Sequence, residues 1–170
     1  MRFWLLVTLV LGCGWLGRIA SSSVRERPRQ LASLEWAVSR LETEINHTMV
    51  FLPEALETVA ELAPAPVDRL FRDVVCMLLE GELPLKEAWC QAIVGAREYL
   101  VLSGDDERIL INLGGSLGVS HRSDQSRHLA MARELLRQQE SLARRLEQQS
   151  CRLYGALGWA LGVALALMLA

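Results

Sequence analysis

A glycine-rich run, Gly114–Gly118, is the part of this chain whose residue types come nearest to a catalytic or phosphate-binding motif. A phosphate-binding P-loop requires a Lys-Ser or Lys-Thr pair after its glycines and a buried strand before them, and both are missing here. Ser116 occupies the centre of a Gly-x-Ser-x-Gly pattern, but no histidine is its neighbour, so a hydrolase is not supported. We interpret the run as a flexible or close-packed turn between helices.

The acidic and metal-ligating residues do not form a recognisable site either. Glu42 and Glu44 are two positions apart, so on a helix they face different directions and suit joint acid–base work poorly. The cysteines and histidines lack a Cys-x-x-Cys pair and any zinc-type spacing. They are Cys13, Cys76, Cys90, Cys151, His47, His121 and His128. The sequence therefore predicts a protein that is not an enzyme and has no cofactor or metal, with buried or idle thiols.

The distribution of charge indicates what kind of protein this is. The chain has 170 residues and a net charge of −2, which gives room for about one domain and argues against nucleic-acid binding. Residues 3–17 and 153–170 contain no charged side chain. A helix of 18 residues is about 27 Å long, close to the thickness of a bilayer core. We predict an N-terminal transmembrane anchor over 1–22, a helical domain over 23–152 and a C-terminal transmembrane helix over 153–170.

Arginines beside the two apolar ends predict the orientation. Four follow the first end and four precede the second, whereas Arg2 alone lies outside them. The positive-inside rule then places the domain in the cytoplasm and both tips outside. Two alternatives stay open for the first end. It could be a signal peptide cleaved near Ala20-Ser21-Ser22, or Val10-Leu11-Gly12-Cys13 could be a lipobox that directs lipidation of Cys13.

Small residues recur every four positions in the second apolar end, at Gly158, Gly162 and Ala166. Such spacing lets two helix backbones approach closely in lipid. These residues are therefore candidates for helix packing in the membrane, although glycine and alanine are common in any membrane span.

The middle of the chain has the apolar spacing of helices and no period-two alternation. Expected segments are a helix from Pro28 to His47, a short one from Pro53 to Pro64, one from Pro66 to Gly81, and one from Pro84. Asp105–Glu107 suits the positive end of a further helix. The last begins near Gln125 and continues without glycine or proline to Gly155, so one helix is expected to run from the domain into the membrane. The fold class is thus all-α, a helical bundle flanked by transmembrane helices.

The last predicted helix combines an apolar stripe with a charged face. A seven-residue rhythm of apolar side chains includes Leu129, Ala132, Leu136, Ala143, Leu146 and Leu153. Its polar face includes Arg133, Arg137, Glu140 and Arg144, and these four are the candidate partner-binding residues. A charged face of this kind is more often simply solvated, so both interpretations stay open.

Several short motifs, taken in order, resemble the stage III sporulation protein AB family. They are Arg27-Pro28-Arg29-Gln30-Leu31, Leu41–Ile45, Leu52–Leu56, Lys86–Trp89, Leu113–Gly118 and Asp124-Gln125. The resemblance extends over nearly the whole chain. Its one departure is the insertion Ser120–Ser123, which leaves open which residue caps the last helix.

The resemblance implies a non-enzymatic membrane component of the secretion-like channel between mother cell and forespore. It implies location in the mother-cell membrane facing the forespore, and a domain similar to the inner-membrane platform protein F of type II secretion and type IV pilus systems. The implied partners are a secretion-type ATPase of the same operon and other membrane subunits, with a homo-oligomer also open. The alternatives are a generic membrane-anchored scaffold or adaptor and an exported lipoprotein.

Overall fold

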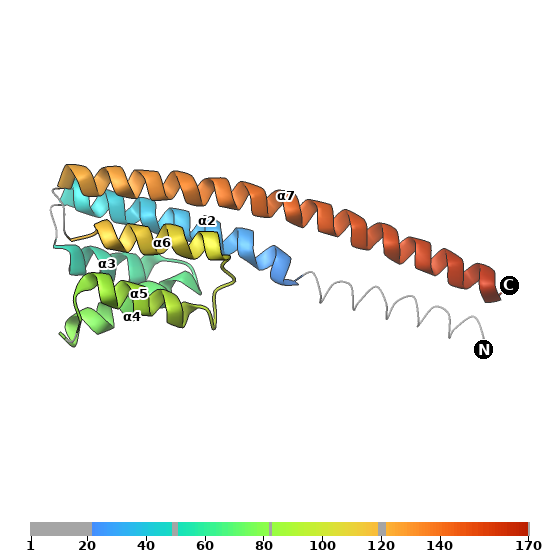
Figure 1. Cartoon of the computed structure of the whole chain (residues 1–170), viewed down its shortest axis with the longest axis horizontal. Helices are drawn as coiled ribbons and strands as arrows, with labels where there is room; N and C mark the ends of the chain where they lie inside the picture. The colour runs from blue at the N-terminus through green and yellow to red at the C-terminus, as the bar shows by residue number, and fades with distance from the viewer. Residues whose placement is uncertain (1–21, 49–50, 82, 119–121, 170) are drawn as a thin grey trace. The chain divides into compact units, whose positions relative to one another are not determined.

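The computed structural model describes residues 22–48, 51–81, 83–118 and 122–169, and their regular structure is entirely helical (Figure 1). At 22–24, 47–48, 122–123 and 150–169 it describes the backbone alone. The elements are α2 (Ser22–Thr43), a π-helical turn η1 (Glu44–Thr48), α3 (Leu52–Leu62), α4 (Val67–Leu79), α5 (Leu85–Ala96), α6 (Gly104–Ser116) and α7 (Arg122–Leu169). The all-α prediction is confirmed for the described part of the chain.

Helix α2 begins earlier than its sequence predicted. Its first residue is Ser22, so Pro28 lies inside the helix rather than at its start. Proline lacks the N–H that would bond to the carbonyl four residues earlier, which is why it normally marks a helix start. The apolar stripe of the helix is as expected, since Leu31, Leu34 and Val38 are fully buried.

The short helices begin and end where their sequence signals lie. Pro53 is in the first turn of α3, and Pro84 directly precedes α5. Gly81 follows α4 with φ +70°, a left-handed conformation that glycine adopts without steric cost. Ser103 caps α6, whose first turn carries the expected acidic residues. These boundaries agree with the predicted segments within a few residues.

Helix α7 is one continuous helix of 48 residues, as its lack of helix breakers predicted. Leu129 and Leu136 are buried in the core, but Leu146 is 53% exposed, so the predicted apolar stripe does not extend that far as a buried face. Within the part of the chain that the structure describes, no helix combines the length and the apolar composition needed for a membrane crossing. The predicted N-terminal anchor, Cys13, and the side chains of the predicted C-terminal span lie outside the described residues.

The centre of the core is an aromatic pair with a glycine against it. The rings of Phe71 and Trp89 meet edge to face at 5.8 Å between centroids. Trp89 is fully buried, and its Nε1 donates to the carbonyl oxygen of Leu110 at 2.7 Å. A Cβ at Gly114 would overlap the indole ring. Gly114 is therefore close-packed as predicted, but it lies inside α6, so the prediction of an interhelix turn over the whole glycine run was wrong.

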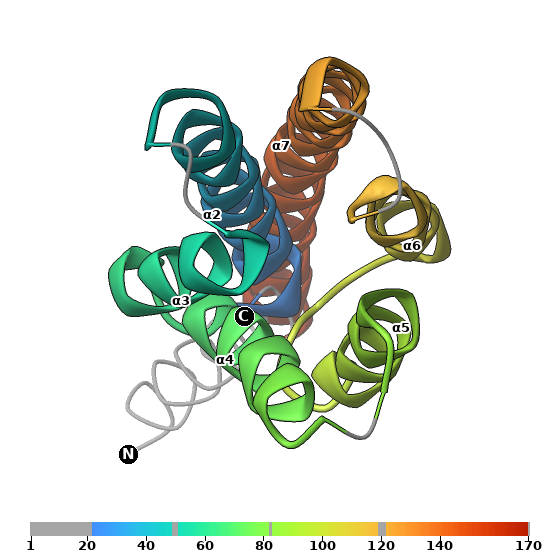
Figure 2. The same cartoon turned by 90° about the vertical axis from the view of Figure 1, so that its left-hand side faces the viewer.

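The chain divides into two compact units, Arg27–Ser141 and a second one made of 1–26 with 142–170. We call Arg27–Ser141 the bundle unit. In it α2 and α7 lie antiparallel, and α3, α4, α5 and α6 complete the bundle (Figures 1 and 2). The second unit contains an ion pair between Arg25 Nε and Glu147 Oε1 at 3.9 Å.

Candidate functional site

The start of α6 holds a carboxylate that is completely removed from solvent. Asp106 Oδ2 accepts a hydrogen bond from the backbone N–H of Ser103 at 2.8 Å, and Ser103 Oγ accepts from the backbone N–H of Asp106 at 3.3 Å. This reciprocal arrangement is a capping box, and it satisfies two N–H groups at the helix start. The cap and the positive end of the helix thus place one negative charge inside the bundle unit.

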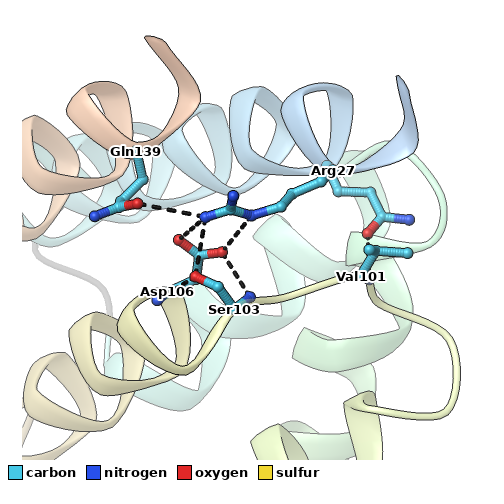
Figure 3. A network of polar contacts seen from close by, with 6 residues as sticks. Arg27, Val101, Ser103, Asp106 and Gln139 are labelled. Atoms are coloured by element: carbon cyan, nitrogen blue, oxygen red, sulfur yellow. Dashed lines mark hydrogen bonds and ion pairs between the residues drawn. The ribbon is translucent and has the colours of Figure 1, made fainter. Parts of the chain in front are cut away.

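Arg27 of α2 reaches across the bundle unit to this carboxylate. Its Nε donates to Asp106 Oδ2 at 2.9 Å and its Nη2 to Oδ1 at 3.1 Å, the two-pronged geometry that a guanidinium allows (Figure 3). The same Nη2 also contacts Ser103 Oγ at 2.9 Å and Gln139 Oε1 of α7 at 3.3 Å. We call Arg27, Ser103, Asp106 and Gln139 the Arg27–Asp106 network; it joins α2, α6 and α7.

A second contact between α2 and the segment before α6 lies one turn further along α2. The buried Gln30 accepts, through its side-chain oxygen, a hydrogen bond of 2.7 Å from the backbone N–H of Val101. Val101 is in the segment between α5 and α6, so this bond holds the connection that leads into the capping box. Both contacts come from the sequence Arg27-Pro28-Arg29-Gln30-Leu31, one of the motifs that carried the family resemblance.

The Arg27–Asp106 network has a structural role, because its polar groups bind one another and so hold the helices together. Each carboxylate oxygen of Asp106 is occupied by a donor, and the charge of Arg27 is balanced by the acid it holds. Neither group is left to bind substrate or transfer a proton. Elsewhere in the described residues, no group of three or more His, Cys, Asp or Glu side chains is placed to hold a metal ion.

The predicted partner-binding residues are not all presented to solvent. Arg133 turns toward α2, where its Nη1 is 3.3 Å from both Glu42 Oε2 and Ser39 Oγ. Arg137 is exposed. Glu140 is half-buried and Arg144 is exposed, and each has an interaction partner. Arg144 also belongs to the second unit rather than to the bundle unit. A docking role for this strip stays a prediction, as does the packing role of Gly158, Gly162 and Ala166, whose side chains are not described.

Comparison with known proteins decides the family. The model of the family described as stage III sporulation protein AB matches residues 2–170. The chain belongs to the stage III sporulation protein AB family. The family resemblance seen in the sequence is therefore confirmed, and this is a structural protein of sporulation stage III from a family that is not known to be enzymatic.

Two stage III sporulation AB relatives support the assignment in sequence and in fold. The stage III sporulation protein AB of Bacillus subtilis (strain 168) is 29% identical over 163 residues, 96% of this chain and 95% of that protein. A solved structure of a stage III sporulation protein AB superposes with a TM-score of 0.68 at 30% identity. It covers 73% of this chain and 98% of the solved chain.

The sequence analysis did not predict the buried ion pair between Arg27 and Asp106. Asp105, Asp106 and Glu107 were expected to favour the helix start through their charge alone. Their neighbour Ser103 supplies the missing signal, because Ser-x-x-Asp is the pattern of a capping box and singles out Asp106. The partner, Arg27, is 79 positions away, and no local pattern identifies it.

Proposed function

We propose that this protein is a non-enzymatic membrane platform subunit of the secretion-like channel between mother cell and forespore, where it docks the secretion-type ATPase of its operon. The family match carries the proposal, because it extends over residues 2–170 and thus includes both apolar ends. We further propose that these ends are transmembrane anchors, 1–22 and 153–170, with the domain between them in the cytoplasm of the mother cell.

Features of the described chain agree with a platform role. The two helices that continue beyond the bundle unit, α2 and α7, are the helices that the Arg27–Asp106 network joins to each other and to α6. Helix α7 has an unbroken helical backbone through Leu169, so the bundle unit and the second apolar end share one element. A subunit that couples a cytoplasmic motor to a membrane channel needs such a connection.

Co-purification from sporulating cells tests the docking role. We expect an affinity-tagged full-length chain, solubilised in mild detergent, to retain the ATPase of the same operon and other membrane subunits of the channel. A tagged unrelated membrane protein of similar topology is the control. If the ATPase elutes with neither, the docking proposal is wrong.

Labelling of Cys76 tests the orientation. The thiol is exposed, and Cys90 is half-buried. A hydrogen bond from Cys76 Sγ to Glu80 Oε1 at 3.4 Å, together with the charge of Glu80, raises the pKa of the thiol, so the labelling is best done near pH 8. In a variant that keeps Cys76 as its single cysteine, we expect an impermeant maleimide to react after the cells are opened. Reaction in intact cells would place the domain outside and contradict the orientation.

Replacement of Gly158 and Gly162 by Leu tests the packing of the C-terminal span. We expect fewer co-purified membrane subunits, because leucine keeps neighbouring helices apart, and an unchanged bundle unit. Equal recovery of those subunits would dismiss the packing role.

A further inference from the structure

Two large apolar side chains are left outside the core at one end of the bundle unit. Phe51 is 80% exposed and Leu79 is 74% exposed, more than any other large apolar residue described. Helix α3 begins at this end and α4 ends there, and α5 begins and α6 ends there too (Figures 1 and 2). Single exposed apolar residues are ordinary, whereas apolar side chains that gather on one surface mark an interaction site.

Two half-buried leucines show that three of these helix ends, the starts of α3 and α5 and the end of α6, converge. A Cβ at Gly118, just after α6, would lie 3.1 Å from Leu85 Cδ2 and 3.8 Å from Leu52 Cδ2. Leu52 opens α3 and Leu85 opens α5. We call Phe51, Leu52, Leu79 and Leu85 the Phe51–Leu79 patch.

The fold itself does not require the two exposed side chains. Phe51 is the N-cap of α3, a position where Ser, Thr, Asp or Asn would stabilise the helix, and its side chain makes no capping hydrogen bond. Leu79 is the last residue of α4 and points its side chain largely into solvent. A polar residue at either position would serve folding better.

Exposed acidic residues lie close in sequence to the patch residues. Glu54 is in the first turn of α3, Glu80 follows α4, and Glu87 is in the first turn of α5; all three are exposed. None of the three has an ion pair among the described residues. Lys86 is the single basic residue among the first four residues of α3 and α5 and the last four of α4 and α6, and Arg122 opens α7 at the same end.

The charge of the bundle unit identifies what can bind there. Within residues 27–141 there are 18 acidic and 12 basic residues, a net charge of −6, whereas the rest of the chain carries +4. A second bundle unit would be repelled, and so would an anionic lipid surface. A helix with apolar residues on one side and Arg or Lys beside them fits both the leucines and the acids.

The location of the patch leaves it free for such a partner. The chain enters the bundle unit at Arg27 and leaves it at Ser141, at the end that contains the Arg27–Asp106 network. The patch lies at the opposite end, where α2 finishes and α7 starts (Figure 1). The patch therefore does not overlap the Arg27–Asp106 network.

We propose that the Phe51–Leu79 patch is the docking surface for a basic amphipathic helix of a cytoplasmic partner protein. This deepens the docking function proposed above and rests on it. Phe51 and Leu79 are the apolar anchors, and the glutamates near them in sequence select a positively charged segment and speed its association.

Binding of the purified ATPase to the full-length chain in neutral-lipid nanodiscs tests the proposal. We expect Leu79→Glu to weaken binding about tenfold or more, because it places a charge in the apolar centre of the interface. Val94→Glu is the matched control: Val94 is 55% exposed on α5 but lies near its other end, and the variant should stay within about twofold of wild type. Wild-type binding should also weaken as salt is raised. Equal binding by the two variants would show that the patch is not the docking surface, while the proposed docking of the ATPase would still stand.

Photo-crosslinking tests whether the patch binds a partner, independently of whether that partner is the ATPase. If the ATPase does not bind wild type, the ATPase part of the proposed function is wrong, and p-benzoyl-L-phenylalanine at position 51 in sporulating cells decides the patch. A crosslink to an Arg- or Lys-rich segment of another channel protein supports it. A crosslink to a second copy of this chain, or a yield no higher than from position 94, overturns it.

Discussion

Removal of the Arg27 guanidinium should destabilise the bundle unit more than any other single arginine change. Arg27→Met keeps the apolar stem but leaves the negative charge of Asp106, which has no exposed surface, with only the N–H of Ser103 and the positive end of α6 to stabilise it. Breaking a buried ion pair by removing one partner costs about 3–5 kcal/mol. Since Arg27 itself is 20% exposed and water can partly replace it, we expect the lower end, about 3 kcal/mol.

Pulse proteolysis of the detergent-solubilised full-length chain across a urea series measures this loss. With a urea dependence of about 2 kcal/mol per molar, the midpoint should fall by about 1.5 M. Arg29→Met is the control, because Arg29 is exposed on the same helix; it should change stability by less than about 0.5 kcal/mol. Arg27→Met combined with Asp106→Asn should be less destabilised than the two single changes added together, because the unpaired buried charge is gone. Similar midpoints for Arg27→Met and Arg29→Met would refute the reasoning.

Two further changes test the core and the surface. Gly114→Ala forces a methyl group into the Trp89 ring and should cost about 1–3 kcal/mol, whereas Gly115→Ala, with open space around it, should be neutral or stabilising; equal midpoints in urea would contradict the packing. At the surface, hydrogen bonds from Arg97 lower the pKa of Glu107. This pair therefore stabilises the fold at pH values above the ordinary glutamate pKa, and its contribution is lost as the pH falls through the lowered pKa. Glu107→Gln should therefore be less stable than wild type at pH 7, and this gap should shrink as the pH falls below the ordinary glutamate range. A gap that does not shrink would disprove the assignment.

The sequence predicted well what depends on neighbouring residues. Prolines, glycines and the apolar spacing of four helices located the elements, and the buried Leu31 and Trp89 are on the faces that this spacing indicated. It failed at two local signals. Pro28 normally opens a helix, yet α2 starts six residues earlier. Gly114 has the composition of a turn, yet it is helical, since only a residue without a side chain fits against Trp89.

The candidate site was harder to predict because the charge of a side chain does not show whether that side chain faces solvent or another helix. On sequence, Arg133 belongs to a solvent-facing strip with Arg137. In the fold its guanidinium turns toward Ser39 and Glu42, so this proposed partner residue makes its contacts within the chain. No prediction from the sequence concerned Phe51, which the fold leaves exposed.

The buried ion pair raises the question of why the bundle unit does not use apolar residues there, which would be at least as stable. An antiparallel helix pair lined with leucine and alanine can slide by a turn at little cost, and polar contacts prevent this. Helix α2, together with the turn η1 that follows it, has polar contacts to α7 at three levels: Arg27 with Gln139, Ser39 with Arg133, and Asn46 of η1 with Ser126 at 3.0 Å. A slide of α2 by one turn against α7 would break all three contacts. A slide of α2 against α6 would leave Asp106 buried without its counter-charge. We infer that the Arg27–Asp106 network, which joins all three helices, favours one register among them, and this specificity is a physical reason to keep a charge inside the bundle unit.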